Sequence, residues 1–203
     1  MKEVLFVILQ DYADWESAHV AAAINDSRED GGDFIVKTVS LSKQPVRSIG
    51  GFTTLPDYDL STAPERFAAL LLIGGKSWRK KESEPVAGLV SKAVEMGVPV
   101  GAICDATVFL GMHGFLNDVK HTSNMLNDLK AAAKENYTNE RGYIEEQAVS
   151  DGGIITANGT AYMEFAKEVL ISLKTINRSS INEWYDYFKF GHYEALKKLA
   201  ASK

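Results

Sequence analysis

Continuous apolar runs alternate along the chain with segments of helical periodicity. Residues 4–9, 67–73 and 98–103 are almost entirely aliphatic or β-branched, which is typical of strands buried on both faces of a sheet. Residues 34–41 alternate between apolar and polar positions and predict a further strand. The segments between these runs predict helices; they span residues 14–24, 85–96, 106–112, 125–134 and 162–176. Strands that alternate with helices predict an α/β fold whose mostly parallel sheet is covered on both faces.

Two hairpins and a C-terminal extension complete the predicted order. Residues 46–55 hold two short β segments around Gly50-Gly51, and residues 147–150 and 154–157 flank the turn Asp151-Gly152-Gly153. We expect residues 1–176 to form one domain. Residues 177–203 read as an added helix that is rich in aromatic side chains and that Gly191 weakens in the middle.

Composition and charge narrow the class of protein. The 203 residues are 45% hydrophobic and 24% charged, with a net charge of −5, so the basic footprint of a nucleic-acid binder is missing. No apolar stretch is long enough for a membrane span, and the first run is too short for a signal peptide. The single cysteine excludes an intrachain disulfide and suits a reducing compartment. These features predict a cytoplasmic protein, and the histidine spacing suggests no metal site.

Three chemically suggestive segments follow predicted strands. They are Asp14-Trp15-Glu16, Gly74-Gly75-Lys76 and Cys104-Asp105. Ligands of open parallel sheets bind outside the carboxyl ends of the strands, so these segments define the predicted site.

Cys104 stands between a buried strand and a helix. The nucleophile elbow of hydrolases has this arrangement, and a helix N-terminus favours a thiolate, which predicts a thiol pKa below that of free cysteine. A buried structural cysteine is the alternative. Glu16 is a candidate partner that could donate a hydrogen bond to the thiolate, or it is ordinary helix-end chemistry. The N–H groups of Gly74, Gly75 and Asp105 could form an oxyanion hole, unless the glycines only end a strand.

Other ligand classes fit the sequence less well. A phosphate-binding loop ending at Gly75-Lys76-Ser77 would require glycine where Leu70 stands. A flavin mononucleotide carrier would need a Ser/Thr/Gly loop after the first strand, where this chain is acidic. A phosphoacceptor receiver domain would need Asp near Ile73. His121 is the best candidate for an active-site acid or base among the four histidines.

Several motifs together resemble the ThiJ/PfpI superfamily, whose fold is that of class I glutamine amidotransferases. They cover about residues 3–175. The motifs are Asp14-Trp15-Glu16, Leu72-Ile73-Gly74-Gly75, Ala102-Ile103-Cys104-Asp105-Ala106-Thr107 and Ile155-Thr156-Ala157-Asn158-Gly159-Thr160-Ala161. The opening segment and Ser48-Ile49-Gly50-Gly51-Phe52 look like a bacterial subgroup of intracellular proteases or amidases. The resemblance implies a flavodoxin-like three-layer sandwich.

The resemblance also implies roles for individual residues. Cys104 would be the nucleophile with Glu16 as its carboxyl partner, and Gly75 and Asp105 would supply oxyanion donors. Candidate substrate-binding residues at these motifs are Gly74, Lys76, Trp15 and Thr160. Family members are commonly homodimers and need no cofactor.

Two departures from the family pattern affect the predicted chemistry. Peptidase members carry His after the cysteine, where this chain has Asp105, and amidotransferases carry His and Glu at Asn158-Gly159-Thr160. A Cys-His-acid triad is therefore incomplete. Three functions stay open: a cysteine-dependent hydrolase, amidase or lyase for a small carbonyl or amide substrate, a redox-sensing or stress protein, and an interaction module with a vestigial site.

Overall fold

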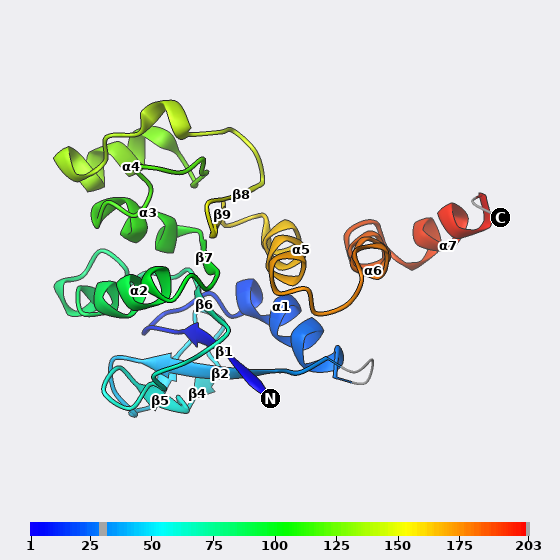
Figure 1. The fold of residues 1–203 in the computed structure, drawn as a ribbon, viewed down its shortest axis with the longest axis horizontal. Coiled ribbons are helices and arrows are strands. Elements are labelled where there is room, and N and C mark those ends of the chain that lie inside the picture. Colours follow the sequence, from blue (N-terminus) through cyan, green and yellow to red (C-terminus); the bar gives the residue numbers. More distant parts are fainter. Residues whose placement is uncertain (29–31, 202–203) are drawn as a thin grey trace.

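A seven-stranded sheet forms the centre of the computed structural model, which describes residues 1–28 and 32–201 (Figure 1). The strand order is β5-β2-β1-β6-β7-β9-β8, and all neighbours are parallel except β8 and β9. The strands are β1 (Lys2–Val7), β2 (Phe34–Ser40), β5 (Tyr58–Asp59), β6 (Ala69–Leu72), β7 (Val100–Ile103), β8 (Ala148–Asp151) and β9 (Ile154–Ala157). The predicted α/β class with a mostly parallel sheet is confirmed.

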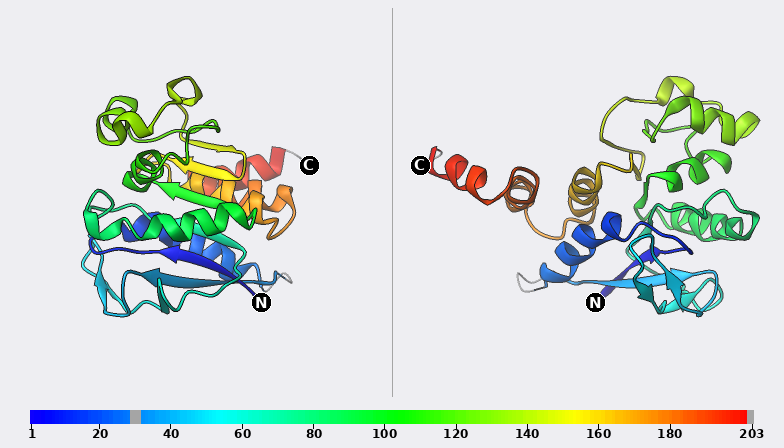
Figure 2. Two further views of the ribbon diagram at one scale, coloured as in Figure 1. Left: turned by 60° about the vertical axis from the view of Figure 1, so that its left-hand side comes forward. Right: turned by 180° about the vertical axis from the view of Figure 1, so that it is seen from behind.

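Helices cover both faces of this sheet. On one face lie α1 (Asp14–Asp26) and α5 (Tyr162–Leu173), which pack against each other. On the other lie α2 (Val86–Glu95) and α3 (Asp105–Met112), with α4 (Leu126–Ala133) packed on α3. Figure 2 shows the three layers from two further directions. Short 3₁₀ turns occur at Lys81–Ser83, Lys134–Asn136 and Glu140–Gly142.

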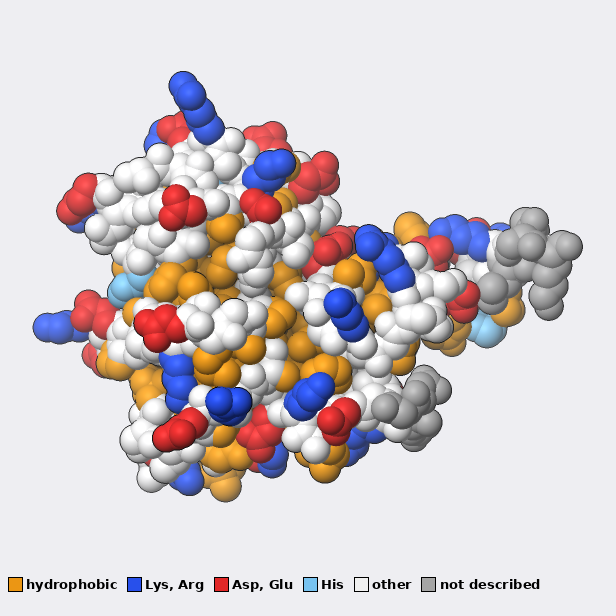
Figure 3. Space-filling model, viewed as in Figure 1, with side chains coloured by type: hydrophobic (Ala, Val, Ile, Leu, Met, Phe, Trp, Pro, Cys, Tyr) orange, Lys and Arg blue, Asp and Glu red, His pale blue; other side chains and the backbone are white. Residues whose placement is uncertain are grey.

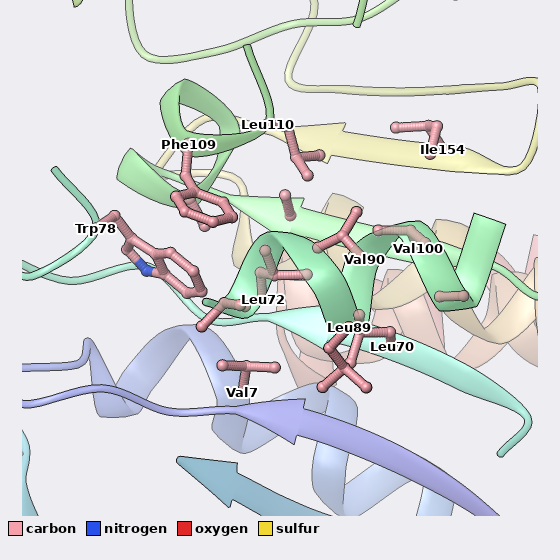
Figure 4. Close-up of a cluster of buried hydrophobic side chains, with 14 of the residues drawn as sticks. Val7, Leu70, Leu72, Trp78, Leu89, Val90, Val100, Phe109, Leu110 and Ile154 are labelled. Atoms are coloured by element: carbon pink, nitrogen blue, oxygen red, sulfur yellow. The ribbon is translucent and has the colours of Figure 1, made fainter. Parts of the chain in front are cut away.

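The core consists of two apolar clusters, one on each face of the sheet. In β1, Leu5 and Val7 point into the cluster beneath α2 and α3, whereas Val4 and Phe6 point into the cluster beneath α1 and α5. Figure 4 shows the first cluster, which includes Trp78. Successive strand side chains point to opposite faces, so a sheet with two covered faces requires the continuous apolar runs seen in the sequence.

The predicted hairpins are present as β3 (Val46–Arg47) with β4 (Thr53–Thr54), and as β8 with β9. Strand β5 was not predicted, because two residues carry no recognisable alternation; it pairs with the end of β2. The predicted C-terminal helical extension is confirmed, but it consists of two helices and not one. Gly191 adopts a φ of 89°, so the chain turns there between α6 (Arg178–Phe190) and α7 (His192–Ala201).

Helices α6 and α7 together form what we call the C-terminal arm. Helix α6 packs on α5 through the buried Ile181, and α7 packs on α6 and extends away from the sheet (Figure 1). Apolar side chains reach the surface along the arm (Figure 3). The large ones that are exposed are Tyr187, Phe188, Phe190, Tyr193 and Leu196. None of the helices in the described part of the chain combines the length and apolar character needed to cross a bilayer.

Candidate active site at the strand ends

Cys104 has a strained backbone conformation. It joins β7 to α3 with φ 60° and ψ −130°, a region that residues with a side chain rarely adopt. Its N–H donates to the carbonyl of Ala157 at 2.9 Å, and its carbonyl accepts from the Thr107 N–H and hydroxyl at 3.1 and 2.6 Å. These bonds hold the turn and place the thiol at the N-terminus of α3.

Glu16 lies against Cys104. The side chain is 1% exposed, and neither carboxyl oxygen has a hydrogen-bond partner of ordinary geometry among the described residues. The close packing depends on Gly74, because a Cβ at that position would lie 2.6 Å from the Cys104 Cβ and would also overlap the Glu16 carboxyl group. Absence of a side chain at Gly74 therefore allows the acid and the thiol to meet.

Burial dominates the titration of this pair. It raises the pKa of Glu16 to about 7, against the weaker opposing influence of the Cys104 thiol and the Gly74 N–H. Burial and then the Glu16 charge raise the pKa of Cys104 to about 11, although the Asn124 amide and the Asp105 N–H lower it. Burial and the neighbouring negative charge therefore oppose the low thiol pKa that a helix N-terminus favours. Between these two values the pair holds a single proton.

Two neighbours of the thiol were missed by the sequence analysis. The Asn124 amide donates to Cys104 Sγ at 3.4 Å, and its oxygen accepts from the Gly159 N–H at 2.8 Å. A hydroxyl bond of 2.7 Å between Thr107 and Ser123 ties the Asn124 loop to α3. A Cβ on Gly159 would lie 2.9 Å from Sγ. Gly159 follows β9 at the same edge of the sheet, so its position in the sequence could have indicated that it lies near the thiol. Asn124 is a single uncharged residue, and nothing in the sequence around it indicated this contact.

The loop after β6 leaves one amide of the predicted oxyanion hole available. Ala13 N–H donates to the Gly74 carbonyl at 2.8 Å, and Lys76 N–H donates to the Asp11 carbonyl at 3.1 Å. These two bonds flank Gly75, whose own N–H takes part in neither. The Lys76 side chain is exposed, and its N–H is engaged with Asp11.

Asp105 is held by an arginine that the sequence analysis did not single out. Its carboxylate accepts from Arg79 Nε at 2.9 and 3.1 Å, and the same guanidinium bonds Asp128 of α4 at 3.0 Å. Among the described residues, the hydrogen bonds of the Asp105 carboxylate go to Arg79, and Cys104 is the residue at the N-cap of α3. The three charges link α4 to the elbow.

Other candidate residues lie in different surroundings. His121 is fully buried, with Nδ1 2.9 Å from the Val119 carbonyl and Nε2 2.7 Å from the Tyr137 hydroxyl, so both ring nitrogens are occupied. This arrangement contradicts the expectation of an active-site imidazole. Trp15 is 44% exposed on the first turn of α1. Thr160 donates to Asn158 Oδ1 from its N–H and hydroxyl, next to Gly159.

A cavity of about 540 Å³ lies beside the Asn124 loop. Cys104 is not among its lining residues, but Asn124 lines the cavity and donates to Sγ. Asn158, next to Gly159, lines another part. Most of its wall consists of hydroxyl and amide side chains, with Glu145 and Glu146 among the lining residues. The cavity wall therefore suits a small polar molecule.

Comparisons with known proteins agree with this geometry. The model of the DJ-1/PfpI family matches residues 2–172. The protein named Uncharacterized protease YdeA from Bacillus subtilis is 37% identical over 98% of this chain and 96% of its own length, and YoaZ, also named an uncharacterized protease, is 32% identical over 91% and 89%.

Solved structures show the same fold. A thiJ/pfpI family protein from Bacillus anthracis has a TM-score of 0.88 at 31% identity and covers 99% of this chain and 96% of that one. A DJ-1 superfamily protein from Agrobacterium tumefaciens has a TM-score of 0.83 at 34% identity, covering 92% and 97%. The family resemblance of the sequence motifs is thus confirmed, and the chain belongs to the DJ-1/PfpI family.

Proposed function

We propose that the chain is a cysteine-dependent hydrolase or amidase, or a lyase, acting on a small carbonyl or amide substrate. The observation that carries the proposal is the strained elbow of Cys104. It places the thiol, at the N-terminus of α3, against the buried carboxyl group of Glu16. Such strain persists only where the surroundings enforce it, and it concentrates at functional sites.

In the hydrolytic reaction, Glu16 accepts the proton of the thiol and the Cys104 thiolate attacks the carbonyl carbon. The N–H groups of Gly75 and Asp105 donate to the oxyanion that forms. Glu16 then returns the proton to the leaving group, which departs and leaves an acyl-thioester on Cys104. Attack by water releases the acid and restores the thiol. Asn124 orients Sγ throughout.

A protease-like mechanism with an imidazole base receives no support from this site. The histidines make their contacts elsewhere: His19 with Tyr162, His113 with Phe109, His121 with Tyr137 and His192 with Tyr187. The protease names of the relatives therefore suggest hydrolysis in general, and we expect poor cleavage of peptides. Asp105→His would place an imidazole beside the thiol and should increase amide hydrolysis.

Redox sensing is the alternative function, and the titration of Glu16 favours it. With a pKa of about 7, this carboxyl is partly protonated at neutral pH and could donate to an oxygen on sulfur. Peroxide would accept the electron pair of the thiolate, so that a sulfur–oxygen bond forms, the O–O bond breaks and water leaves. In either function we place the protein in the cytoplasm, since its single cysteine suits a reducing compartment, and we propose a homodimer.

Intact-mass measurement separates these functions. Wild type and Cys104→Ala are treated with iodoacetamide, a dicarbonyl such as methylglyoxal, and peroxide. Alkylation and carbonyl adducts confined to Cys104 would support the enzyme, whereas oxygen additions without carbonyl adducts would support the sensor. The rate of alkylation should rise through about pH 7, where Glu16 ionises and can accept the thiol proton, and rise again towards pH 11, where the thiol itself ionises. An unreactive Cys104 would contradict both functions.

A further inference from the structure

Arg79 bridges two acidic side chains that belong to different helices. Its guanidinium donates to Asp105 from Nε at 2.9 and 3.1 Å, and to Asp128 from Nη1 at 3.0 Å. Asp105 begins α3 directly after Cys104, and Asp128 lies in the first turn of α4. One cation therefore joins the N-termini of two helices, and the cluster of two carboxylates and one guanidinium keeps one net negative charge.

The residue before Arg79 fixes this part of the loop after β6. Trp78 is buried, and its indole N–H donates to the Ile73 carbonyl at 2.7 Å. Its ring centroid lies 5.0 Å from that of Phe109, which belongs to α3. The backbone next to Arg79 is thus held both to the end of β6 and to the elbow helix, so the guanidinium meets Asp105 from a fixed position.

The carboxylate that Arg79 binds would otherwise oppose the chemistry proposed for Cys104. The Asp105 N–H is a proposed donor to the oxyanion, and a free carboxylate on the same residue would repel that negative charge. Burial is the main cause that raises the pKa of Glu16 to about 7; the charge of Asp105 adds to it, whereas the thiol and the Gly74 N–H lower it. A guanidinium on this carboxylate opposes its influence, because it places a positive charge beside the negative one.

The second carboxylate connects Arg79 to another neighbour of the thiol. Asn124 donates to Sγ from the loop that precedes α4, and Asp128 lies in the first turn of that helix. The contact between Arg79 and Asp128 therefore ties the start of α4, and with it the Asn124 loop, to the residue after Cys104. Without the guanidinium, the carboxylates of Asp105 and Asp128 would repel each other.

We propose that Arg79 is a positioning residue of the Cys104 site, which offsets the charge of Asp105 at the thiol and holds α4 and the Asn124 loop in place. The inference rests on the proposed function, since it assigns a role to a further residue of the same site. Arg79 acts through Asp105 and not by contact with the substrate.

The pH dependence of Cys104 alkylation by iodoacetamide tests this role, with rates followed by intact mass. Arg79→Gln leaves the Asp105 charge unopposed, so the rise of the rate near pH 7 should move upward by about half a pH unit, and the rate at pH 7 should fall roughly twofold. Lys80→Gln removes the same charge from the next side chain, which is exposed, and should leave the profile unchanged. No shift in Arg79→Gln, or an equal shift in both variants, would overturn the proposal.

Removal of the Asp105 charge separates this role from a general support of the fold. Asp105→Asn should move the rise to lower pH, and Arg79→Gln with Asp105→Asn should regain at least the wild-type rate at pH 7. Arg79→Lys keeps the positive charge without the forked geometry and should recover most of the shift. A double variant as slow as Arg79→Gln would mean that Arg79 only supports the fold, and would overturn the proposal. Absence of Cys104 alkylation in the wild type at every pH would refute the proposed function and this inference with it.

Discussion

The elbow at Cys104 and the C-terminal arm differ in how local conformation relates to packing. At the elbow an unfavourable backbone conformation is enclosed by Gly74, Gly159 and the buried Glu16. In the arm the backbone is regular helix, yet Tyr193 is 78% exposed. Dense surroundings can impose a costly conformation, whereas favourable helical geometry does not by itself bury a side chain. Substitutions at the two regions should therefore differ in kind.

Replacement of Cys104 should produce the largest effect. Cys104→Ala and Cys104→Gly should both lose all iodoacetamide labelling, because the chain has no other thiol. Glycine tolerates positive φ, so Cys104→Gly should be more stable than Cys104→Ala by about 1–2 kcal/mol in urea unfolding. Equal stability of the two variants would show that the elbow is not strained.

Removal of the Glu16 charge should stabilise the protein at alkaline pH. Folding raises the pKa of this carboxyl group from 4.5 to about 7. The folded state is therefore stabilised by the protonated group; this contribution to the free energy of unfolding is fully present below about pH 4.5 and is lost as the pH rises through 7. Glu16→Gln resembles the protonated acid, and its gain over wild type should grow to about 3 kcal/mol above pH 8. Urea unfolding at several pH values measures this, with the exposed Glu65→Gln as the control. A gain that does not change with pH would contradict the burial argument.

A methyl group at Gly74 should disturb the elbow. It would lie 2.6 Å from the Cys104 Cβ and 2.9 Å from the Ile103 carbonyl oxygen, so Gly74→Ala should cost about 1–3 kcal/mol and slow the labelling of Cys104. Gly88→Ala is the matched control in α2, because its Cβ would have no atom within 4 Å, and alanine should stabilise that helix by up to about 1 kcal/mol. Similar stabilities of both variants would mean that the elbow has spare room.

Substitution in the arm should have the smallest effect on folding. Tyr193→Ser should change the free energy of unfolding by no more than about 0.5 kcal/mol and leave the labelling of Cys104 intact. If the exposed aromatic side chains of the arm join the proposed homodimer, sedimentation should show dissociation at concentrations where wild type is dimeric. A monomeric wild type would refute the dimer. A dimer unaffected by Tyr193→Ser and by Phe190→Ser would place its interface elsewhere.

The longer strands and the position of the candidate nucleophile were determined by the sequence itself. Burial on both faces requires continuous apolar runs, and a residue that follows such a run lies at the ligand-binding edge of a parallel sheet. The residue at that junction was therefore evident as Cys104, with Glu16 and Gly74 at the ends of neighbouring strands. These inferences need only local patterns and the regular geometry of the sheet.

Only the tertiary structure decided what surrounds the thiol. Asn124 contacts Sγ from a loop twenty residues downstream, and Arg79 is separated from Asp105 in the sequence by α2 and β7. Neither contact produces a periodic pattern in the sequence. Nor does the position at a helix terminus alone determine the thiol pKa, because burial and the charge of Glu16 raise it. The apolar pattern of a sequence indicates which residues are buried. Which polar groups contact one another at the site depends on how distant segments pack, and these contacts determine the pKa values and the chemistry of the site.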